Sequence, residues 1–441
     1  MARVDGFAGT LLFPGDDGYD EARQVWNGMI DRRPSIIARC TGTADVAAIV
    51  RYVRERGLRA TVRGGGHNVA GLALADDAAL IDLSPMRGVT VAPEQRVAVA
   101  DGGCLLRDLD EATAPHGLAC PSGVVADTGL GGLALGGGYG WLARRWGLTC
   151  DHVVGVEIVL TDGSVRDVDD ESNPDLMWAL RGGGGGNLGV VTRFRLALRP
   201  VTDVLVCRST YSAGRIVEAI GFYRDAAVSQ PDDLHTVAAV KPAGADGRPE
   251  LVVTALWTGD PDDGRRATGR LADMSGPDSS VEQLRPFLDL QRAGDGTEPP
   301  GHRYFTKSCY LTDLPAAAAV TLAEAARDSP SPLSSIDFEF LRGAIATPST
   351  RSAFPHRDAP YICTASAHWT APSEDAPNAA WARHTVEQLG AWHVGSPYSN
   401  YVQDPVGAIA LFGPERGERL ARLKQRYDGT NTLYGTKALS S

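Results

Sequence analysis

The chain has 441 residues and a formal net charge of −11, and 43% of its residues are hydrophobic. This length exceeds what one hydrophobic core usually supports, so we expect two domains, and the acidic balance argues against a nucleic-acid-binding surface. No apolar run approaches the roughly 20 residues of a membrane span, and the first residues lack the order of a signal peptide, so we expect a cytoplasmic protein without a membrane partner. Because the seven cysteines include no Cys-x-x-Cys pair, we expect neither a metal site nor a disulfide framework.

The first predicted elements form a βαβ unit. A helix is predicted at residues 19–27, a strand at residues 35–39 and another strand at residues 59–63. Between the two strands, Thr43 suits a helix N-cap, and apolar residues follow at helical spacing: Val46, Ile49, Val50 and Val53.

A glycine run follows the second strand directly: Gly64, Gly65 and Gly66, and then His67. Glycines carry no Cβ and reach positive φ, so successive backbone N–H groups can converge on an anion such as a diphosphate. A flexible connector is the alternative for such a turn. His67 would lie at the edge of whatever the loop holds, although a single histidine can also fill a hydrogen-bonding niche.

A second glycine-rich segment spans residues 121–140. It follows predicted strands at residues 80–83, 89–91 and 97–100 and a predicted helix at residues 104–114. So much glycine argues against an ordinary helix or strand and favours the close approach of a flat ligand. A Rossmann turn is the weaker alternative, because its glycines open a helix directly after a strand, with an acidic residue about 20 positions later.

The remaining elements divide at residue 201. Before it, Asp162-Gly163 predicts a hairpin between residues 153–161 and 164–168, and a helix at 173–180 and a strand at 190–198 follow. After it, the glycine runs end and strands alternate with helices, which fits an antiparallel sheet with helices on one face. The predicted strands are 235–240, 250–257, 303–311, 336–341 and 361–369, and the predicted helices are 215–229, 316–328 and 376–389.

Three segments taken together resemble one known family. Residues 63–67, residues 121–141 and the glycine run at residues 180–189 resemble the berberine bridge enzyme-like branch of the FAD-linked oxidases, which has the vanillyl-alcohol oxidase, or PCMH-type, fold. The resemblance implies an α+β chain of two domains. Residues 1–200 would form the FAD-binding domain, residues 201–397 a substrate-binding domain built on an antiparallel sheet, and residues 398–441 a segment that returns to the first domain.

The resemblance also implies the FAD contacts, and in this family the histidine after the glycines is bonded to the 8α carbon of the flavin. Residues 428–434 resemble the family's closing element, but residues 435–438 depart from its usual Asn-Gln-Asn. The implied FAD-binding residues are Arg63, Gly64, Gly65, Gly66, His67, Asn68, Gly71, Ser122, Gly123, Thr128, Gly131, Gly132, Gly137, Gly138 and Asn431.

A second covalent bond to the flavin is not expected. Many relatives attach the flavin ring to a cysteine that lies a few residues before the Gly131-Gly132 pair, and here that position is Val125. Cys120 lies five residues earlier and more resembles a buried thiol. We therefore expect attachment through His67 alone and a compact substrate.

Catalysis needs a group that accepts a proton within hydrogen-bond reach of the substrate. By resemblance, Tyr139 and Tyr398 are candidates, and a segment around Tyr398 resembles the family's Tyr-x-Asn-Tyr strand. A phenol has a pKa of about 10, so the protein would have to lower it. Glu339 is the next candidate, because strand alternation could point it inward, but an exposed carboxylate or an ion pair is the simpler interpretation.

The leading hypothesis is an oxidase that transfers a hydride from a small organic substrate of specialised metabolism to covalent FAD, with dioxygen as the final acceptor. Flavin-dependent oxygenation or oxidative cyclisation would use the same residues. A non-catalytic flavin-binding protein would never lose flavin colour with substrate, and a nicotinamide-dependent dehydrogenase would contain no yellow chromophore.

Overall fold

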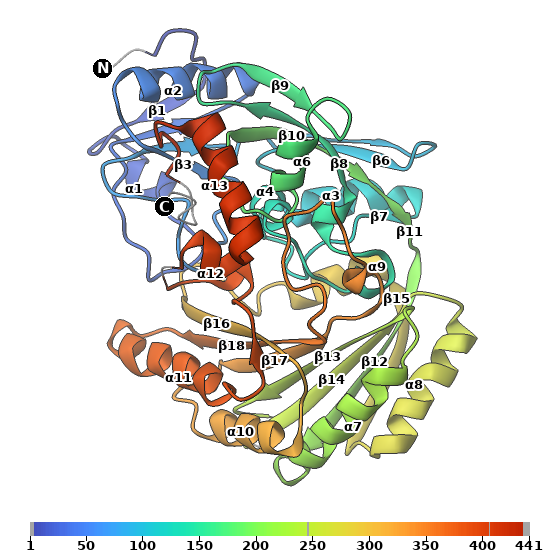
Figure 1. Cartoon of the computed structure of the whole chain (residues 1–441). Coiled ribbons are helices and arrows are strands. Elements are labelled where there is room, and N and C mark those ends of the chain that lie inside the picture. The colour runs from blue at the N-terminus through green and yellow to red at the C-terminus, as the bar shows by residue number, and fades with distance from the viewer. Residues whose placement is uncertain (1–3, 245–246, 405, 435–441) are drawn as a thin grey trace.

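The computed structural model describes residues 4–244, 247–404 and 406–434. In Figure 1 the upper half holds two sheets and several short helices, and the lower half holds one large sheet with helices beneath it. The first sheet has the strand order β1-β2-β4-β3, with β2, β4 and β3 parallel. The predicted βαβ unit is present, but β4 lies between its two strands. The elements are β1 (Thr10–Leu12), β2 (Ile36–Arg39), α2 (Thr43–Glu55), β3 (Ala60–Arg63) and β4 (Ala79–Asp82).

The second sheet is antiparallel and has the order β5-β6-β10-β8-β9, which includes the predicted hairpin of β8 and β9. Its strands are β5 (Val89–Ala92), β6 (Val97–Asp101), β8 (Val153–Val159), β9 (Val165–Val168) and β10 (Val190–Ala197). The other elements of this half are α1 (Tyr19–Ala22), α3 (Leu106–Thr113), α4 (Leu130–Leu135), α5 (Ala143–Trp146), α6 (Pro174–Leu180) and the pair β7 (Leu118–Ala119) and β11 (Arg199–Pro200).

Two predictions for this half were wrong. The glycine-rich segment contains helix α4, because Leu130, Ala134 and Leu135 are buried in the core of this half, and that packing outweighs the cost of the glycines. The helix predicted at residues 19–27 ends at Ala22, because the chain then turns so that the N–H of Trp26 donates to the carbonyl of Gly66.

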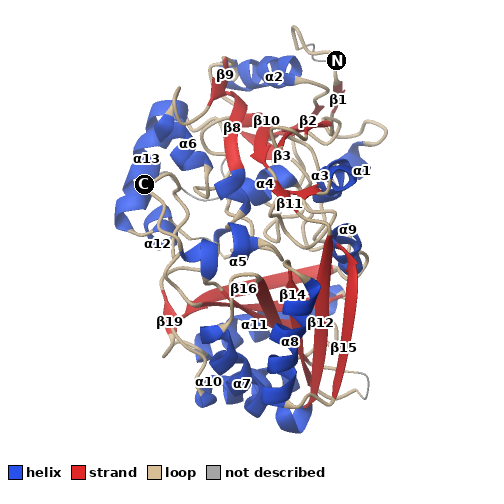
Figure 2. Cartoon of the chain, turned by 90° about the vertical axis from the view of Figure 1, so that its right-hand side faces the viewer, coloured by secondary structure: helices blue, strands red, loops and turns tan. Residues whose placement is uncertain are grey.

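The third sheet has eight antiparallel strands in the order β15-β12-β14-β13-β17-β18-β16-β19. Its strands are β12 (Asp203–Ser212), β13 (Leu234–Lys241), β14 (Glu250–Trp257), β15 (Ser279–Pro286), β16 (Arg303–Leu311), β17 (Ser335–Phe340), β18 (Tyr361–Trp369) and β19 (His393–Val394). The helices are α7 (Ile216–Ser229), α8 (Pro261–Ser275), α9 (Phe287–Gln291), α10 (Ala316–Arg327) and α11 (Asp375–Gln388). As the sequence predicted, α7, α10 and α11 cover one face of the sheet, and Figure 2 shows α5 on the other side.

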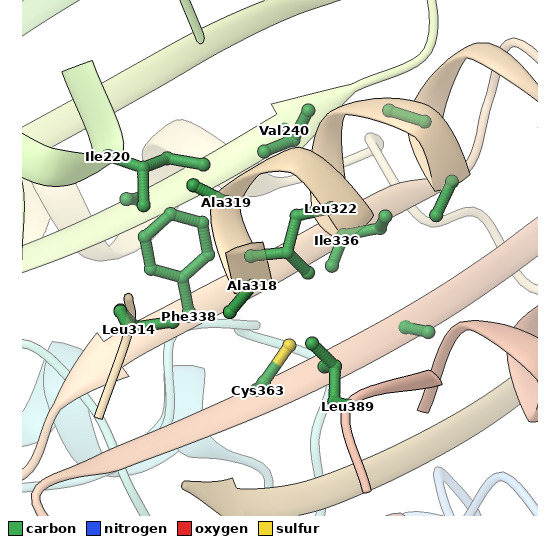
Figure 3. Close-up of a cluster of buried hydrophobic side chains, with 14 of the residues drawn as sticks. Ile220, Val240, Leu314, Ala318, Ala319, Leu322, Ile336, Phe338, Cys363 and Leu389 are labelled. Carbon is green, nitrogen blue, oxygen red and sulfur yellow. The ribbon is translucent and has the colours of Figure 1, made fainter. Parts of the chain in front are cut away.

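The two faces of this sheet differ in polarity. Ile336 and Phe338 of β17 point toward α10 and pack with Ala318, Ala319 and Leu322, as Figure 3 shows. Because side chains alternate along a strand, Asp337 and Glu339 point to the opposite face, toward the upper half. Residues of neighbouring strands in register with Glu339 therefore lie on that face too.

The last described helices lie on the upper half, where α12 (Ala408–Phe412) and α13 (Pro414–Asp428) pack beside α6 (Figure 1). Leu433 then pairs with Ala60 at the edge of β3. The strand predicted around Tyr398 was wrong, because residues 399–401 form a short helical turn. Side chains hold this turn against the second glycine-rich segment, with Ser399 donating to the carbonyl of Gly136 and Asn400 to that of Leu133.

Candidate functional site

His67 lies in the loop after β3 and is held by a neighbouring ring. Its imidazole stacks on Trp26, with ring centroids 4.2 Å apart and an angle of 18° between the planes. Burial lowers the pKa of His67 to about 4, so the ring is neutral at physiological pH. Its Nε2 atom is buried without a hydrogen-bond partner. A neutral imidazole with an unpartnered nitrogen is a nucleophile with a free position for a bond.

The two glycine-rich segments pack directly against each other. A Cβ at Gly65 would lie 2.5 Å from the backbone nitrogen of Gly129, and a Cβ at Gly129 would lie 2.3 Å from that of Gly65. Gly66 has a positive φ of 70°, which turns the chain toward His67. Part of the glycine content therefore serves backbone packing rather than a ligand, whereas a Cβ at Gly132 would meet only open space.

A pocket opens beside the first glycine loop. Gly64 and Gly65 line it together with Ser84 and Gly103. Backbone without Cβ atoms and a hydroxyl give a surface that suits phosphate oxygens. The residues present therefore fit the diphosphate that the sequence predicted for this loop.

Other predicted FAD-binding residues hold the loops in place. The Arg63 guanidinium donates to the buried carboxylate of Asp82 over 3.0 and 2.7 Å and to the carbonyls of Ala22 and Gln24. Asn68 accepts a hydrogen bond from the N–H of Ala70 and so forms a local turn that leads to Gly71, which has a positive φ.

The second glycine-rich segment is held by hydrogen bonds from Gln291, the last residue of α9. Gln291 donates hydrogen bonds to the Ser122 hydroxyl and the Gly123 carbonyl, and also to the carboxyl group of Asp110. Burial raises the pKa of Asp110 to about 7. The backbone carbonyl of Thr128 accepts from the N–H of Leu106 at the start of α3, and Gly131 packs against Phe194.

Gly137 and Gly138 bring the second segment to a group of tyrosines. Both glycines have positive φ, and the N–H of Gly138 donates to the hydroxyl of Tyr398 over 2.9 Å. The rings of Tyr398 and the adjacent Tyr139 lie 4.6 Å apart, so the structure brings the two predicted tyrosines together. Tyr310, which was not predicted, lies with its hydroxyl 2.9 Å from that of Tyr139.

The pKa shifts of the tyrosines are opposite to the expected ones. Burial raises the pKa of Tyr139, Tyr310 and Tyr398 above the ordinary value of a phenol. The hydrogen bonds that Tyr398 accepts from Gly138 and Asn400 act in the other direction, but burial outweighs them. The expected lowering of a tyrosine pKa was therefore wrong, and the three hydroxyls keep their protons near neutral pH.

Three carboxyl groups form what we call the acidic wall: Asp337 and Glu339, which point to the same side of the large sheet, and Glu298, whose pKa responds to the charge of Asp337. Glu298 comes from the loop before β16, and the other two come from β17. Burial, followed by repulsion from Asp337, raises the pKa of Glu298 to about 7. Burial raises the pKa of Asp337 to about 6 despite a hydrogen bond from Ser335. The acidic wall therefore has two carboxyl groups that ionise close to neutral pH.

Glu339 does point to this side, as the sequence allowed, and it also has a partner. Its carboxylate lies 3.6 Å from Nε2 of His235 on β13. Sequence reasoning did not find Glu298, Asp337 or His235. Period-two alternation in residues 335–340 was the signal available for Asp337, and the loop position of Glu298 gave none.

Two further predictions concern a second covalent bond to the flavin and the residues near the C-terminus. Cys120 is fully buried in the hydrophobic core, where burial raises the pKa of its thiol. Asn431 adopts a left-handed backbone with φ of 51° in the turn after α13, and its N–H donates to the carbonyl of Asp428. Residues 435–438, where the sequence departs from the family pattern, lie outside the described residues.

Within the residues that the structure describes, no group of three or more His, Cys, Asp or Glu side chains could hold a metal ion. Likewise, no described helix is long and apolar enough to cross a membrane.

Comparison with known proteins gives consistent matches along the chain. Residues 34–169 match the FAD binding domain family. An FAD-linked oxidoreductase of Dictyostelium discoideum is 30% identical over 97% of this chain and 93% of its own length. The (R)-6-hydroxynicotine oxidase of Paenarthrobacter nicotinovorans is 39% identical over 43% of this chain and 41% of its own length.

Solved structures agree with the sequence matches. The crystal structure of 6-hydroxy-D-nicotine oxidase from Arthrobacter nicotinovorans superposes with a TM-score of 0.87 at 28% identity, over 97% of both chains. The berberine bridge enzyme-like protein 1 of Physcomitrella patens superposes with a TM-score of 0.89 at 20% identity, over 98% of this chain and 97% of the other. At 20% identity, the match to the Physcomitrella patens protein supports the fold alone.

Proposed function

Because this chain belongs to the berberine bridge enzyme-like FAD-linked oxidoreductases, we propose that it is an oxidase of small organic molecules whose FAD is bonded to His67. When bound, FAD accepts a hydride from the substrate and returns the electrons to dioxygen. The chain's own residues hold the cofactor, orient the substrate and accept its proton.

The proposal rests on three properties of His67: its fixed ring, its neutral charge and its unpartnered nitrogen. Its ring is fixed by Trp26 and kept neutral by burial, and its Nε2 atom has no partner. An orphan buried nitrogen costs about 1–3 kcal/mol unless it is satisfied, so a bond at this atom removes a penalty that the fold otherwise carries. The pocket beside Gly64 and Gly65 supports the same cofactor from the diphosphate end.

The substrate would lie between the tyrosines of the upper half and the acidic wall. Tyr139 and Tyr398 remain candidates for contact with the substrate, and with their raised pKa they would act there as hydrogen-bond donors. A general base works best when its pKa is near the working pH. Asp337, with a pKa of about 6, and Glu298, with a pKa of about 7, meet this condition better than the phenols do.

Reoxidation of the reduced protein tests the oxidase without knowledge of the substrate. The purified yellow protein would be reduced with dithionite without oxygen and then mixed with air-saturated buffer. We expect the flavin absorption to return within seconds, with one hydrogen peroxide formed per flavin. A protein that stays reduced in air, or that carries no flavin at all, would contradict the proposal.

A further inference from the structure

The imidazole of His67 depends on an aromatic contact for its orientation. The three residues before it, Gly64, Gly65 and Gly66, have no side chains that could hold the ring. Among the described residues, no other side chain forms a hydrogen bond with the imidazole, and the aromatic ring that stacks on it belongs to Trp26. The direction in which the unpartnered Nε2 atom points therefore depends on the face of the Trp26 indole.

Trp26 is itself fixed from both halves of the molecule. Its backbone N–H donates to the carbonyl of Gly66, the residue directly before His67. Its indole N–H donates to the carbonyl of Glu298 over 2.9 Å, and its own carbonyl accepts from the N–H of Gly301. Glu298 and Gly301 lie in the loop that leads into β16 of the large sheet. Trp26 thus connects the glycine loop of the upper half to the lower half.

The other face of the indole is covered by Tyr304 of β16. The two ring centroids lie 3.7 Å apart, with an angle of 17° between the planes. Tyr304 is buried, and its hydroxyl donates to the carbonyl of Pro299 over 2.8 Å. Stacked aromatic pairs stabilise a structure beyond the area that they bury. The indole therefore lies between the rings of His67 and Tyr304 and cannot tilt without displacing one of them.

We propose that Trp26 is the positioning residue for flavin attachment, and that its stacking on Tyr304 makes attachment depend on the packing of the lower half against the upper half. This inference rests on the proposed function and specifies how the bond at His67 is favoured. The indole limits rotation of the imidazole, so Nε2 stays in one direction while the bond forms. Attachment would then be completed only in chains whose two halves have docked.

The bond that this arrangement favours forms with atoms and electrons in balance. Nε2 of His67 bonds to the 8α carbon, a C–H bond of that carbon breaks, and the imidazole loses the proton on its other nitrogen. The two electrons and two protons pass to dioxygen, the acceptor that the proposed oxidase already uses, and give hydrogen peroxide. Correct placement of two reacting groups accelerates such a step, and an error of about 1 Å can cost about 100-fold in rate.

The test measures covalent incorporation and reversible binding of FAD separately. The full chain would be produced in riboflavin-starved cells, mixed with FAD in air-saturated buffer and sampled over time. Flavin absorption that stays with the acid-precipitated protein reports the covalent bond. Reversible affinity is measured by titration of FAD into the same variants combined with His67→Ala, in which no bond at residue 67 can form. Thermal melting checks that each variant is folded.

Four variants locate the effect. Trp26→Leu removes the ring and should slow incorporation by about 100-fold without an equal loss of reversible affinity. Trp26→Phe should restore the rate to within about tenfold of wild type, because a phenyl ring still offers an aromatic face. Tyr304→Leu, which removes the outer ring, should slow incorporation by about tenfold. Trp392→Leu is the control, because Trp392 packs in the core on the opposite face of the large sheet and should not affect incorporation.

The possible results separate this inference from the proposed function. Wild-type incorporation rates in Trp26→Leu would overturn the inference and leave attachment at His67 intact. An equal loss of reversible affinity and incorporation rate would also overturn it, because Trp26 would then only support the loop. If Trp26→Leu does not fold, a wild-type rate in Tyr304→Leu overturns the inference. A wild-type protein that binds FAD but never retains it in acid would refute the proposed attachment, and the inference with it.

Discussion

The hydroxyl of Tyr398 is surrounded by donors: the N–H of Gly138 lies 2.9 Å away and the amide of Asn400 lies 3.0 Å away. Both contacts stabilise the phenolate, and yet burial keeps the pKa above that of a free phenol. Because the Tyr398 oxygen already accepts two hydrogen bonds, the hydroxyl can interact further by donating its own proton. We therefore propose that the tyrosines orient the substrate and that carboxyl groups of the acidic wall accept its proton.

The pH dependence of flavin reduction distinguishes these roles. We expect the anaerobic reduction rate to rise with pH through the range from about 6 to about 7, because Asp337 and Glu298 accept protons only after they ionise. Tyr398→Phe should slow reduction by about tenfold and keep this profile. The measurement is stopped-flow bleaching with the fastest compound among benzylamine, N-methylbenzylamine and benzyl alcohol. Loss of the pH-dependent limb in Tyr398→Phe, with a decrease of about 10²–10⁴-fold, would restore the tyrosine as the base.

The residues of the site differ in how far the sequence could identify them. His67 and the glycines stand in one continuous segment, so their chemistry can be read locally. Tyr310, Asp337 and His235 come to the same side of the large sheet only after β16, β17 and β13 have paired, and a one-residue change of register would turn each away. Glu298 depends on the path of a loop, which no periodic pattern describes.

The ends of β3 and β4 are joined by a buried ion pair that positions the first glycine loop. Arg63 is the last residue of β3, and its guanidinium forms two hydrogen bonds with Asp82, the last residue of β4. Asp82 is fully buried and also accepts hydrogen bonds from the N–H and hydroxyl of Ser84. These partners hold the pKa of Asp82 below its usual range against the effect of burial.

Asp82→Asn should destabilise the fold by about 3–5 kcal/mol, because it leaves the Arg63 charge buried without its counterion. The measurement is denaturant unfolding near neutral pH, with Asp262→Asn as the control, since Asp262 forms an exposed pair with Arg265. The lowered folded-state pKa means that the wild-type advantage is complete above the unfolded value of about 3.9 and is lost as the pH falls through the folded value. Equal stability of Asp82→Asn and wild type near neutral pH would show that the pair does not hold the loop.

At the scale of elements, the predictions that succeeded concern elements with a buried face, although β12, whose side chains also alternate in burial, was missed. α2 and the strands β13, β14, β16, β17 and β18 carry clear apolar periodicity because one side of each meets a core. β15 was missed because it is an edge strand with almost every side chain exposed. α8 was missed because its sequence is rich in charge and contains two glycines. Exposed elements are fixed by the strands and helices beside them, which local patterns do not record.

A column of rings joins the two halves of the molecule at the site. Trp26 stacks on His67 on one side and on Tyr304 of β16 on the other, with ring centroids 4.2 and 3.7 Å apart. Tyr304 in turn stacks on His368 of β18, 4.6 Å away. Asn27 adds hydrogen bonds to the carbonyls of Val69 and Tyr304. The loop that carries His67 is thus packed against the large sheet, so the proposed sites of cofactor attachment and substrate binding depend on one shared arrangement.

The attachment of the flavin is the feature on which this account depends most. The purified protein would be precipitated in acid, digested with trypsin and mapped by mass spectrometry, alongside His67→Ala, Cys120→Ala and the exposed-histidine control His116→Ala. We expect the mass of FAD on the peptide that contains His67, its absence in His67→Ala, and unchanged attachment in the other two variants. FAD on the peptide that contains Cys120, or flavin released freely from the wild type by acid, would contradict the account.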